Sequence, residues 1–176
     1  MPIEKLVPTA NASDSGNHLQ ENDFTLIDET VASADGSINS SKINDRSAGP
    51  EVVWSSITDL SEAPSSVNSA TFRCRARTAR VISGGDTCTY RMRCVVGGTN
   101  YDLTWNEGEN SFADKTIAVG TGFTEAQYNA ATVSFLQTVY NQDMGADGLE
   151  FEIDAFELEV DFNTNGGPAK RLYIIS

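Results

Sequence analysis

Apolar and polar residues alternate strictly along residues 67–82, VNSATFRCRARTARVI. Phe72 and Cys74 share one side of this stretch, and Arg73 and Arg75 share the other. Successive side chains of a strand point to opposite faces, so alternation with a period of two is typical of a strand buried on one face. The pattern predicts a half-buried strand whose arginines face outward.

The same alternation returns in TCTYRMRCVV, residues 87–96, after the turn-forming segment SGGD. Two alternating runs separated by a glycine-containing turn predict a β-hairpin. If both apolar sides face the core, the numbers of paired residues sum to about 168, which places Cys74 opposite Cys94. We expect two buried, reduced thiols there, with a cross-strand disulfide as the alternative.

The segment LEFEIDAFELEVDF, residues 149–162, alternates as well, but its apolar phase changes part-way along. Phe151 belongs to the first phase and Phe156 to the second. A regular strand cannot move its apolar side chains to the other face without an irregularity. We therefore predict a β-bulge, or a passage of the strand between two sheets, at Ala155–Phe156.

The rest of the chain predicts shorter elements separated by frequent turns. The expected strands lie at 23–30, near Ile38, at 52–60, 99–105, 116–120, 133–139 and 171–176, the stretch at 52–60 being either a strand or an irregular segment anchored by Trp54. Thr124 and Gln127 have the spacing of a capping box, which predicts a short helix over about 125–132.

About eight short strands with at most one short helix are typical of an all-β fold, an antiparallel β-sandwich of jelly-roll-like type. No alternation of strands and helices is present, so a nucleotide-binding α/β sheet is not expected. Residues 1–22 are polar and lack an apolar period, and they predict an extended N-terminal arm. Residues 23–176 are expected to form a single β-sandwich domain.

The chain carries 25 acidic and 12 basic residues, a formal net charge of −13. This charge disfavours attraction to nucleic acid or to an anionic membrane surface. No run approaches the 18 or so apolar residues of a transmembrane helix, and the N-terminus has no apolar core of a secretory signal. The remaining question is why six arginines lie within residues 73–93.

These arginines point to a charged sheet face. Arg73, Arg75 and Arg77 occupy successive outward positions of one predicted strand, and Arg91 and Arg93 face outward on its hairpin partner. Residues 143–161 hold eight carboxylates and no lysine or arginine. The outward acids predicted there are Glu150, Glu152 and Asp154, or Glu157, Glu159 and Asp161.

Ladders of opposite charge on neighbouring strands stabilise each other by a few tenths of a kcal/mol for each pair. We therefore predict that the arginines form ion pairs with these acids, either within the chain or between subunits. Docking on another protein is the alternative interpretation. A nucleic-acid site is disfavoured because a sheet that binds RNA also exposes aromatic residues among its basic ones, whereas here the aromatics fall on the apolar side.

Other candidate chemistry is weak. Alternating carboxylates of a strand are typical of a solvated sheet face rather than of a glycosidase pair. His18 is the only histidine, which leaves a serine or cysteine nucleophile without a well-placed base. We expect no cofactor, apart from a weak Ca²⁺ candidate in NQDMGADGLE, where the ligands would be Asn141, Asp143 and Asp147. Trp54 and Trp105 are expected in the core or at an interface, with sugar stacking as the alternative.

The order of segments is similar to a known group of proteins. After a polar N-terminal region the chain presents FTLIDETVASADGSINSS, VVWSSITDL, SATFRCRARTAR, GGTNYDLTW, TEAQYNAA and GLEFEIDAFELEV. Over residues 23–162 this layout resembles the small single-jelly-roll virion structural proteins of tailed phages, which act as capsid decoration (cement) proteins or as parts of tails and fibres. The resemblance lies in strands and turns, so it implies a class of protein and assigns no functional residues.

The resemblance implies a protein that is not an enzyme and that binds and stabilises the shell of the major capsid protein. Its expected location is the outer surface of the virion, assembled in the host cytoplasm. Its expected partners are the major capsid protein and copies of itself, a trimer being one closed ring that would cover open sheet edges. The alternatives are a tail, neck or fibre component, or a carbohydrate-binding module with Trp54, Trp105 or Tyr101 exposed.

Overall fold

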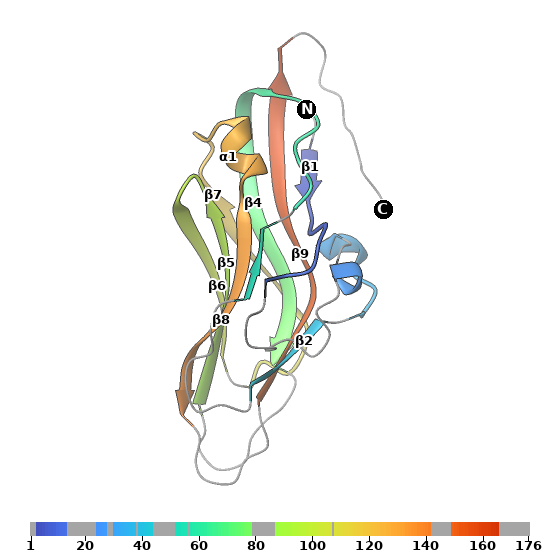
Figure 1. Ribbon diagram of the computed structural model, residues 1–176, viewed down its shortest axis with the longest axis vertical. Helices are drawn as coiled ribbons and strands as arrows, with labels where there is room; N and C mark the ends of the chain where they lie inside the picture. The colour runs from blue at the N-terminus through green and yellow to red at the C-terminus, as the bar shows by residue number, and fades with distance from the viewer. Residues whose placement is uncertain are drawn as a thin grey trace.

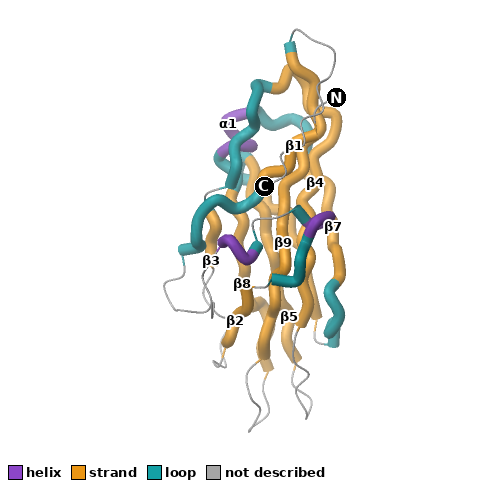
Figure 2. Tube along the Cα trace, turned by 90° about the vertical axis from the view of Figure 1, so that its right-hand side faces the viewer, coloured by secondary structure: helices purple, strands orange, loops and turns teal. Residues whose placement is uncertain are grey.

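In the computed structural model, two β-sheets pack face to face, and their strands run along the long axis of the molecule (Figures 1 and 2). The structure describes residues 3–13, 24–27, 30–37, 39–43, 52–55, 57–78, 87–106, 108–141 and 149–165. The first sheet contains β1 (Ile3–Leu6), β2 (Asn39–Ile43), β9 (Leu149–Thr164), β4 (Pro64–Thr78) and β7 (Ala113–Val119). The second contains β3 (Val52–Trp54), β8 (Thr132–Asn141), β5 (Thr87–Val96) and β6 (Thr99–Asn106).

The strand pairs are nested within one another. β5 pairs with β6, β4 with β7, β3 with β8, and β2 with β9, all antiparallel. A chain paired in this way is one long hairpin rolled up into two sheets, with strand orders β2-β9-β4-β7 and β3-β8-β5-β6. This is a jelly roll, and it confirms the predicted all-β antiparallel sandwich.

The predicted hairpin between residues 67–82 and 87–96 is wrong. β4 lies between β9 and β7 in one sheet, and β5 lies between β8 and β6 in the other. Cys74 is therefore not opposite Cys94, and both are buried free cysteines. The alternation identified which side of each strand is buried, but two strands with buried apolar sides can equally be neighbours in one sheet or face each other across the core.

The irregularity predicted at Ala155–Phe156 is present one residue earlier. Arg75 pairs with Ala155, but the next residue of β4, Ala76, pairs with Ile153. Asp154 is the extra residue, so it forms a β-bulge in β9. The apolar residues on both sides of the bulge are buried in the same core, as the phase change required.

The prediction of an extended arm over residues 1–22 is wrong for residues 3–13, and residues 1–2 and 14–22 lie outside the described part. β1 pairs with β9 in the first sheet, and Ser13 forms a bridge to Val53 of β3 in the second. Backbone hydrogen bonds and the burial of alternate residues such as Leu6 hold this segment in place. Four residues of alternation were too few to distinguish a strand from a polar arm.

The helical elements are short. α1 (Glu125–Asn129) begins with the predicted capping box, in which Thr124 and Gln127 satisfy each other's backbone amides. Within the strand expected at 23–30, residues 24–26 form a 3₁₀ helix instead, η1 (Phe24–Leu26), and Ile27 after it is buried. A second 3₁₀ helix, η2 (Val31–Ser33), follows. The predicted strand at 171–176 lies outside the described residues.

Aromatic rings fill the space between the sheets. Tyr90, Phe135 and Phe151 stack with centroids 4.9 to 5.8 Å apart, and Trp105 packs edge-on against Phe151. Trp54 packs edge-on against Phe156 of the opposite sheet. Both tryptophans are fully buried, as expected. Among the described residues, no helix is long and apolar enough to cross a membrane.

Candidate functional site

The arginines of β4 lie on the outer face of the first sheet and pair with carboxylates of their own chain. Arg77 Nε lies 2.6 Å from Glu152 Oε2, and Arg73 Nη2 lies 3.1 Å from Glu159 Oε1. Arg75 joins both neighbouring strands, because its Nε is 2.8 Å from Asp154 of β9 and its Nη1 is 2.9 Å from Asp114 of β7. The predicted pairing with the acids of 149–161 is thus made within one chain.

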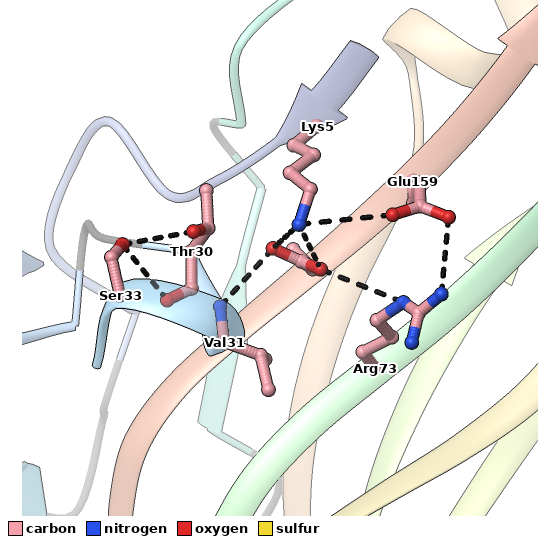
Figure 3. Close-up of polar contacts among 7 residues, drawn as sticks. Lys5, Thr30, Val31, Ser33, Arg73 and Glu159 are labelled. Carbon is pink, nitrogen blue, oxygen red and sulfur yellow. Dashed lines mark hydrogen bonds and ion pairs between the residues drawn. The ribbon is translucent and has the colours of Figure 1, made fainter. Parts of the chain in front are cut away.

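Glu157 lies among Lys5, Val31 and Arg73, which Figure 3 labels together with Glu159. Its side chain is 0% exposed and accepts hydrogen bonds from Lys5 Nζ at 2.9 and 3.2 Å. The backbone N–H of Val31 donates to the same carboxylate at 3.1 Å, and Arg73 Nε lies 3.6 Å away. A buried carboxylate is stable only when charges and donors surround it, and here they come from β1, η2 and β4.

Asp154, the bulged residue of β9, holds a second point of segment 30–37, the segment whose Val31 amide contacts Glu157. Its side chain is 1% exposed, and it accepts hydrogen bonds from the backbone of Gly36 at 3.1 Å and from Arg75. The segment 30–37 is therefore attached to the outer face of β9 through two buried carboxylates, those of Asp154 and Glu157. The bulge has a structural use here, since it re-aims one acid toward this segment.

Arg91 and Arg93 do not share a face with the arginines of β4, so the single basic face predicted from the hairpin is wrong. They lie on β5, in the other sheet. Arg93 donates two hydrogen bonds to Asp102 of β6, at 2.7 and 2.8 Å, and Arg91 Nε is 3.9 Å from the same carboxylate. The bonds from Arg93 hold the pKa of Asp102 below its ordinary value.

These pairs leave no open basic surface in the part of the chain with described side chains. Each lysine or arginine there has a carboxylate within 3.9 Å, the residues being Lys5, Arg73, Arg75, Arg77, Arg91, Arg93 and Lys115. A nucleic-acid site needs cations that are available to phosphates. Of the other predicted acids, Asp161 accepts a hydrogen bond from Asn68, and the side chain of Glu150 lies outside the described part.

The buried cysteines and the candidate Ca²⁺ ligands are the other groups to which the sequence analysis gave possible chemistry. Burial raises the pKa of Cys74 well above its ordinary value and that of Cys94 to about 12, so both stay protonated thiols and are poor nucleophiles. Among the described residues, no group of three or more His, Cys, Asp or Glu side chains is placed to hold a metal ion. The side chains of the Ca²⁺ candidate, Asn141, Asp143 and Asp147, lie outside that part.

A sugar-stacking platform requires an exposed aromatic face, which neither tryptophan has. Lys115 covers Trp105 at the edge between the sheets, with its Nζ 4.8 Å from the centroid of the indole ring. Lys115 also pairs with Glu109 at 2.6 Å. The receptor-binding interpretation therefore loses the two residues on which it mainly rested.

The structure adds residues that the sequence pattern did not single out. Lys5 and the backbone amide of Val31 complete the cluster around Glu157, and Asp114 pairs with Arg75. Glu4, 4% exposed, accepts hydrogen bonds from the backbone and hydroxyl of Ser61. The run of acidic residues in β9 indicated that basic residues would lie around it. Nothing in the sequence indicated that Lys5 would be one of them.

A groove of about 370 Å³ lies at the end of the sandwich where β4 begins. Its walls are residues 63–67 on one side and 121–125 on the other. Figure 1 shows α1 beside the end of the sandwich where β4 begins. Val67 and Phe123 are half-buried apolar residues in these walls, and Glu125 is the only charged residue among the lining side chains. The groove and the two ion-paired sheet faces are the surface features on which a functional proposal can draw.

Comparison of the chain with models of protein families and with curated proteins finds no match.

Proposed function

We propose that this chain is a structural protein of a tailed-phage virion that decorates the capsid by binding the major capsid protein. The observation that supports this most directly is the nested strand pairing, since jelly rolls recur in virus shells and in other binding domains. A fold alone does not establish a function, so the proposal also draws on the chemistry of the surface.

That surface is suited to binding proteins of basic surface potential. The chain carries a net charge of −13, and the cations with described side chains are held by its own carboxylates. Exposed acids such as Asp59 and Glu62 add negative charge to this surface. Electrostatic complementarity of this kind favours a positively charged protein over nucleic acid.

The rigidity of the two outer faces fits a non-catalytic, stabilising role. Cross-strand ion pairs cover the first sheet, and segment 30–37 is fastened across it by Glu157 and Asp154. Surfaces that are ordered before binding lose little entropy when they associate. We propose that such a preformed surface spans joints between neighbouring capsid subunits and slows their separation.

Cosedimentation with phage particles tests the proposal. Purified chain is added to heads assembled without it and, separately, to purified tails; binding to heads with a rise in the temperature of head disruption is the expected result. An unrelated acidic protein of similar size and charge is the control for nonspecific attraction. Binding to tails alone would replace the decoration role by the tail, neck or fibre role, and binding to neither would refute both.

A further inference from the structure

The first residues of β4 have a strand neighbour on one side only within the described chain. Residues 64–69 pair with β9, from Pro64 opposite Thr164 to Ser69 opposite Asp161, with register shifts between Pro64 and Ser66 and between Val67 and Ser69. On the other side, pairing with β7 begins only at Ala70, opposite Val119. The chain that follows β7 diverges toward α1 instead of continuing the ladder.

The groove beside α1 lies along this open edge. One wall is residues 63–67, which include the start of β4, and the other is residues 121–125, which leave β7. The groove thus occupies the place that a longer β7 would have filled. An exposed strand edge beside a groove lined by both apolar and polar residues suits strand addition, in which backbone hydrogen bonds give affinity and alternate side chains fill the groove.

The chemistry of the groove matches one segment of this chain. After β9, residues 169–176 read AKRLYIIS, with two cations followed by a run rich in β-branched and aromatic residues. Leu172 and Ile174 share one side of such a strand and suit the apolar surface of Val67 and Phe123. Lys170 and Arg171 carry the charge opposite to that of Glu125, the one charged residue that lines the groove.

The donor is better placed in a second copy than in the same chain. The connection leading into β4 passes across this end of the sandwich, since Leu60 N–H donates to Asn129 of α1 and Ser61 donates to Glu4 of β1. A tail that ran from the end of β9 to the far edge of β4 would cross that connection. Connections at one end of a sheet rarely cross, and a tail from a neighbour meets no such obstacle.

We propose that residues 169–176 of one copy add as a strand to the edge of β4 at residues 64–69 of a second copy. Reciprocal donation closes a dimer and cyclic donation closes a ring, so the exchange ends in a closed oligomer. The inference goes beyond the proposed function, which concerns binding to the capsid, and gives a structural basis for the self-association expected from the sequence. Because its test uses the isolated protein, a failure there leaves capsid binding unaffected and the two proposals can be judged separately.

Cysteine cross-linking between differently labelled copies tests the exchange. Ser66→Cys places a thiol on the groove wall and Ile174→Cys places one on the donated segment, and the two full-length variants are mixed under mild oxidation. The expected product is a covalent dimer that contains one chain of each variant. Each variant alone is the control for the native thiols, and Thr104→Cys, exposed on the opposite sheet, is the matched control for the groove position.

The cross-linking results distinguish exchange between copies from nonspecific contact and from pairing within one chain. A heterodimer that forms with Ser66→Cys and not with Thr104→Cys supports the exchange. Equal yields with both positions overturn it. Cross-linking only within a single chain that carries both Ser66→Cys and Ile174→Cys also overturns it, because the donor is then the chain's own segment.

Self-association measured by sedimentation supplies an independent readout. Replacing Leu172 and Ile174 together by Asp is expected to weaken association by about tenfold for each apolar side chain lost from the groove. The control is Thr116→Asp, an exposed substitution on β7 away from the groove, which should leave the association constant unchanged. A double Asp variant that associates as strongly as the native chain would contradict the proposal.

Discussion

Glu157→Gln is the substitution that most directly tests how the charged face of the first sheet is held together. The native carboxylate is fully buried and receives two contacts from Lys5 at 2.9 and 3.2 Å, one from the Val31 amide at 3.1 Å, and a longer one from Arg73 at 3.6 Å. An amide side chain keeps the volume but removes the negative charge. One of its two polar atoms is also a donor, which cannot accept from Lys5.

The expected cost follows from these contacts. Removing one partner of a buried ion pair costs about 3–5 kcal/mol when the remaining charge is stranded. Lys5 and Arg73 are not fully stranded, because their side chains are 25% and 35% exposed and both also approach Glu159, at 3.7 and 3.1 Å. We therefore expect Glu157→Gln to lower the free energy of unfolding by about 2–3 kcal/mol, below that range.

Glu159→Gln is the matched control, since it makes the same chemical change two residues away in β9. Glu159 is 21% exposed, and surface pairs of this kind contribute roughly 0.2–1 kcal/mol. Both variants reduce the net negative charge by one, so long-range effects of charge cancel in the comparison. Urea denaturation, followed by tryptophan fluorescence because Trp54 and Trp105 are buried, measures both losses.

Hydrogen exchange locates the effect. In Glu157→Gln the amides of β1 and of Val31 should exchange faster than those of β5, because β1 and η2 are the elements that Glu157 attaches. Equal losses of stability in the two variants would refute the reasoning, as would a loss below about 1 kcal/mol for Glu157→Gln. Either result would mean that the buried charge contributes no more than a surface pair.

Three further predictions concern a turn, the thiols and pH. Gly97→Ala should lower the free energy of unfolding, measured by urea denaturation, by about 2–4 kcal/mol, because φ is +55° and a new Cβ would lie 2.6 Å from the ring of Phe123. Gly98→Ala, with φ +79° and open space around the new Cβ, should cost only about 1 kcal/mol. Equal costs for the two variants would contradict the close approach at Gly97. Cys74 and Cys94 should not react with a thiol reagent at pH 8 until the protein unfolds, and rapid labelling of either, located by mass spectrometry, would count against their burial. Asp102→Asn should lower the free energy of unfolding at neutral pH by up to about 1 kcal/mol. Because the folded pKa of Asp102 is lowered, this stabilisation is present above the ordinary pKa of 3.8 and is lost as pH falls through the folded pKa. The stabilities of the native protein and the variant should therefore converge at low pH.

The strands with long alternation were predictable from the sequence. Residues 70–76 and 90–96 bury every second side chain, and β6 and α1 lie within a residue or a few of their predicted positions. The change of phase in 149–162 also predicted the bulge in β9 to within one residue of Asp154. These predictions succeeded because a period of two and a capping box are local properties of the chain.

The choice of neighbouring strands was not predictable in the same way. The sequence favoured a hairpin between two consecutive alternating runs, yet β4 and β5 lie in different sheets. Because the β4 arginines and the β5 arginines consequently face away from each other, the single basic face does not exist. The pairing of Arg73, Arg75 and Arg77 with β9 was expected only because the complementary acids were visible in the sequence.

By itself, the sequence determined the class of fold, the buried side of each long strand and the presence of two oppositely charged ladders. The tertiary structure decided which ladder meets which, that an N-terminal lysine and segment 30–37 enclose Glu157, and that an open edge of β4 lies beside a groove. The physical reason is that alternation acts over a few residues, whereas strand order depends on contacts between residues as far apart as Lys5 and Glu157.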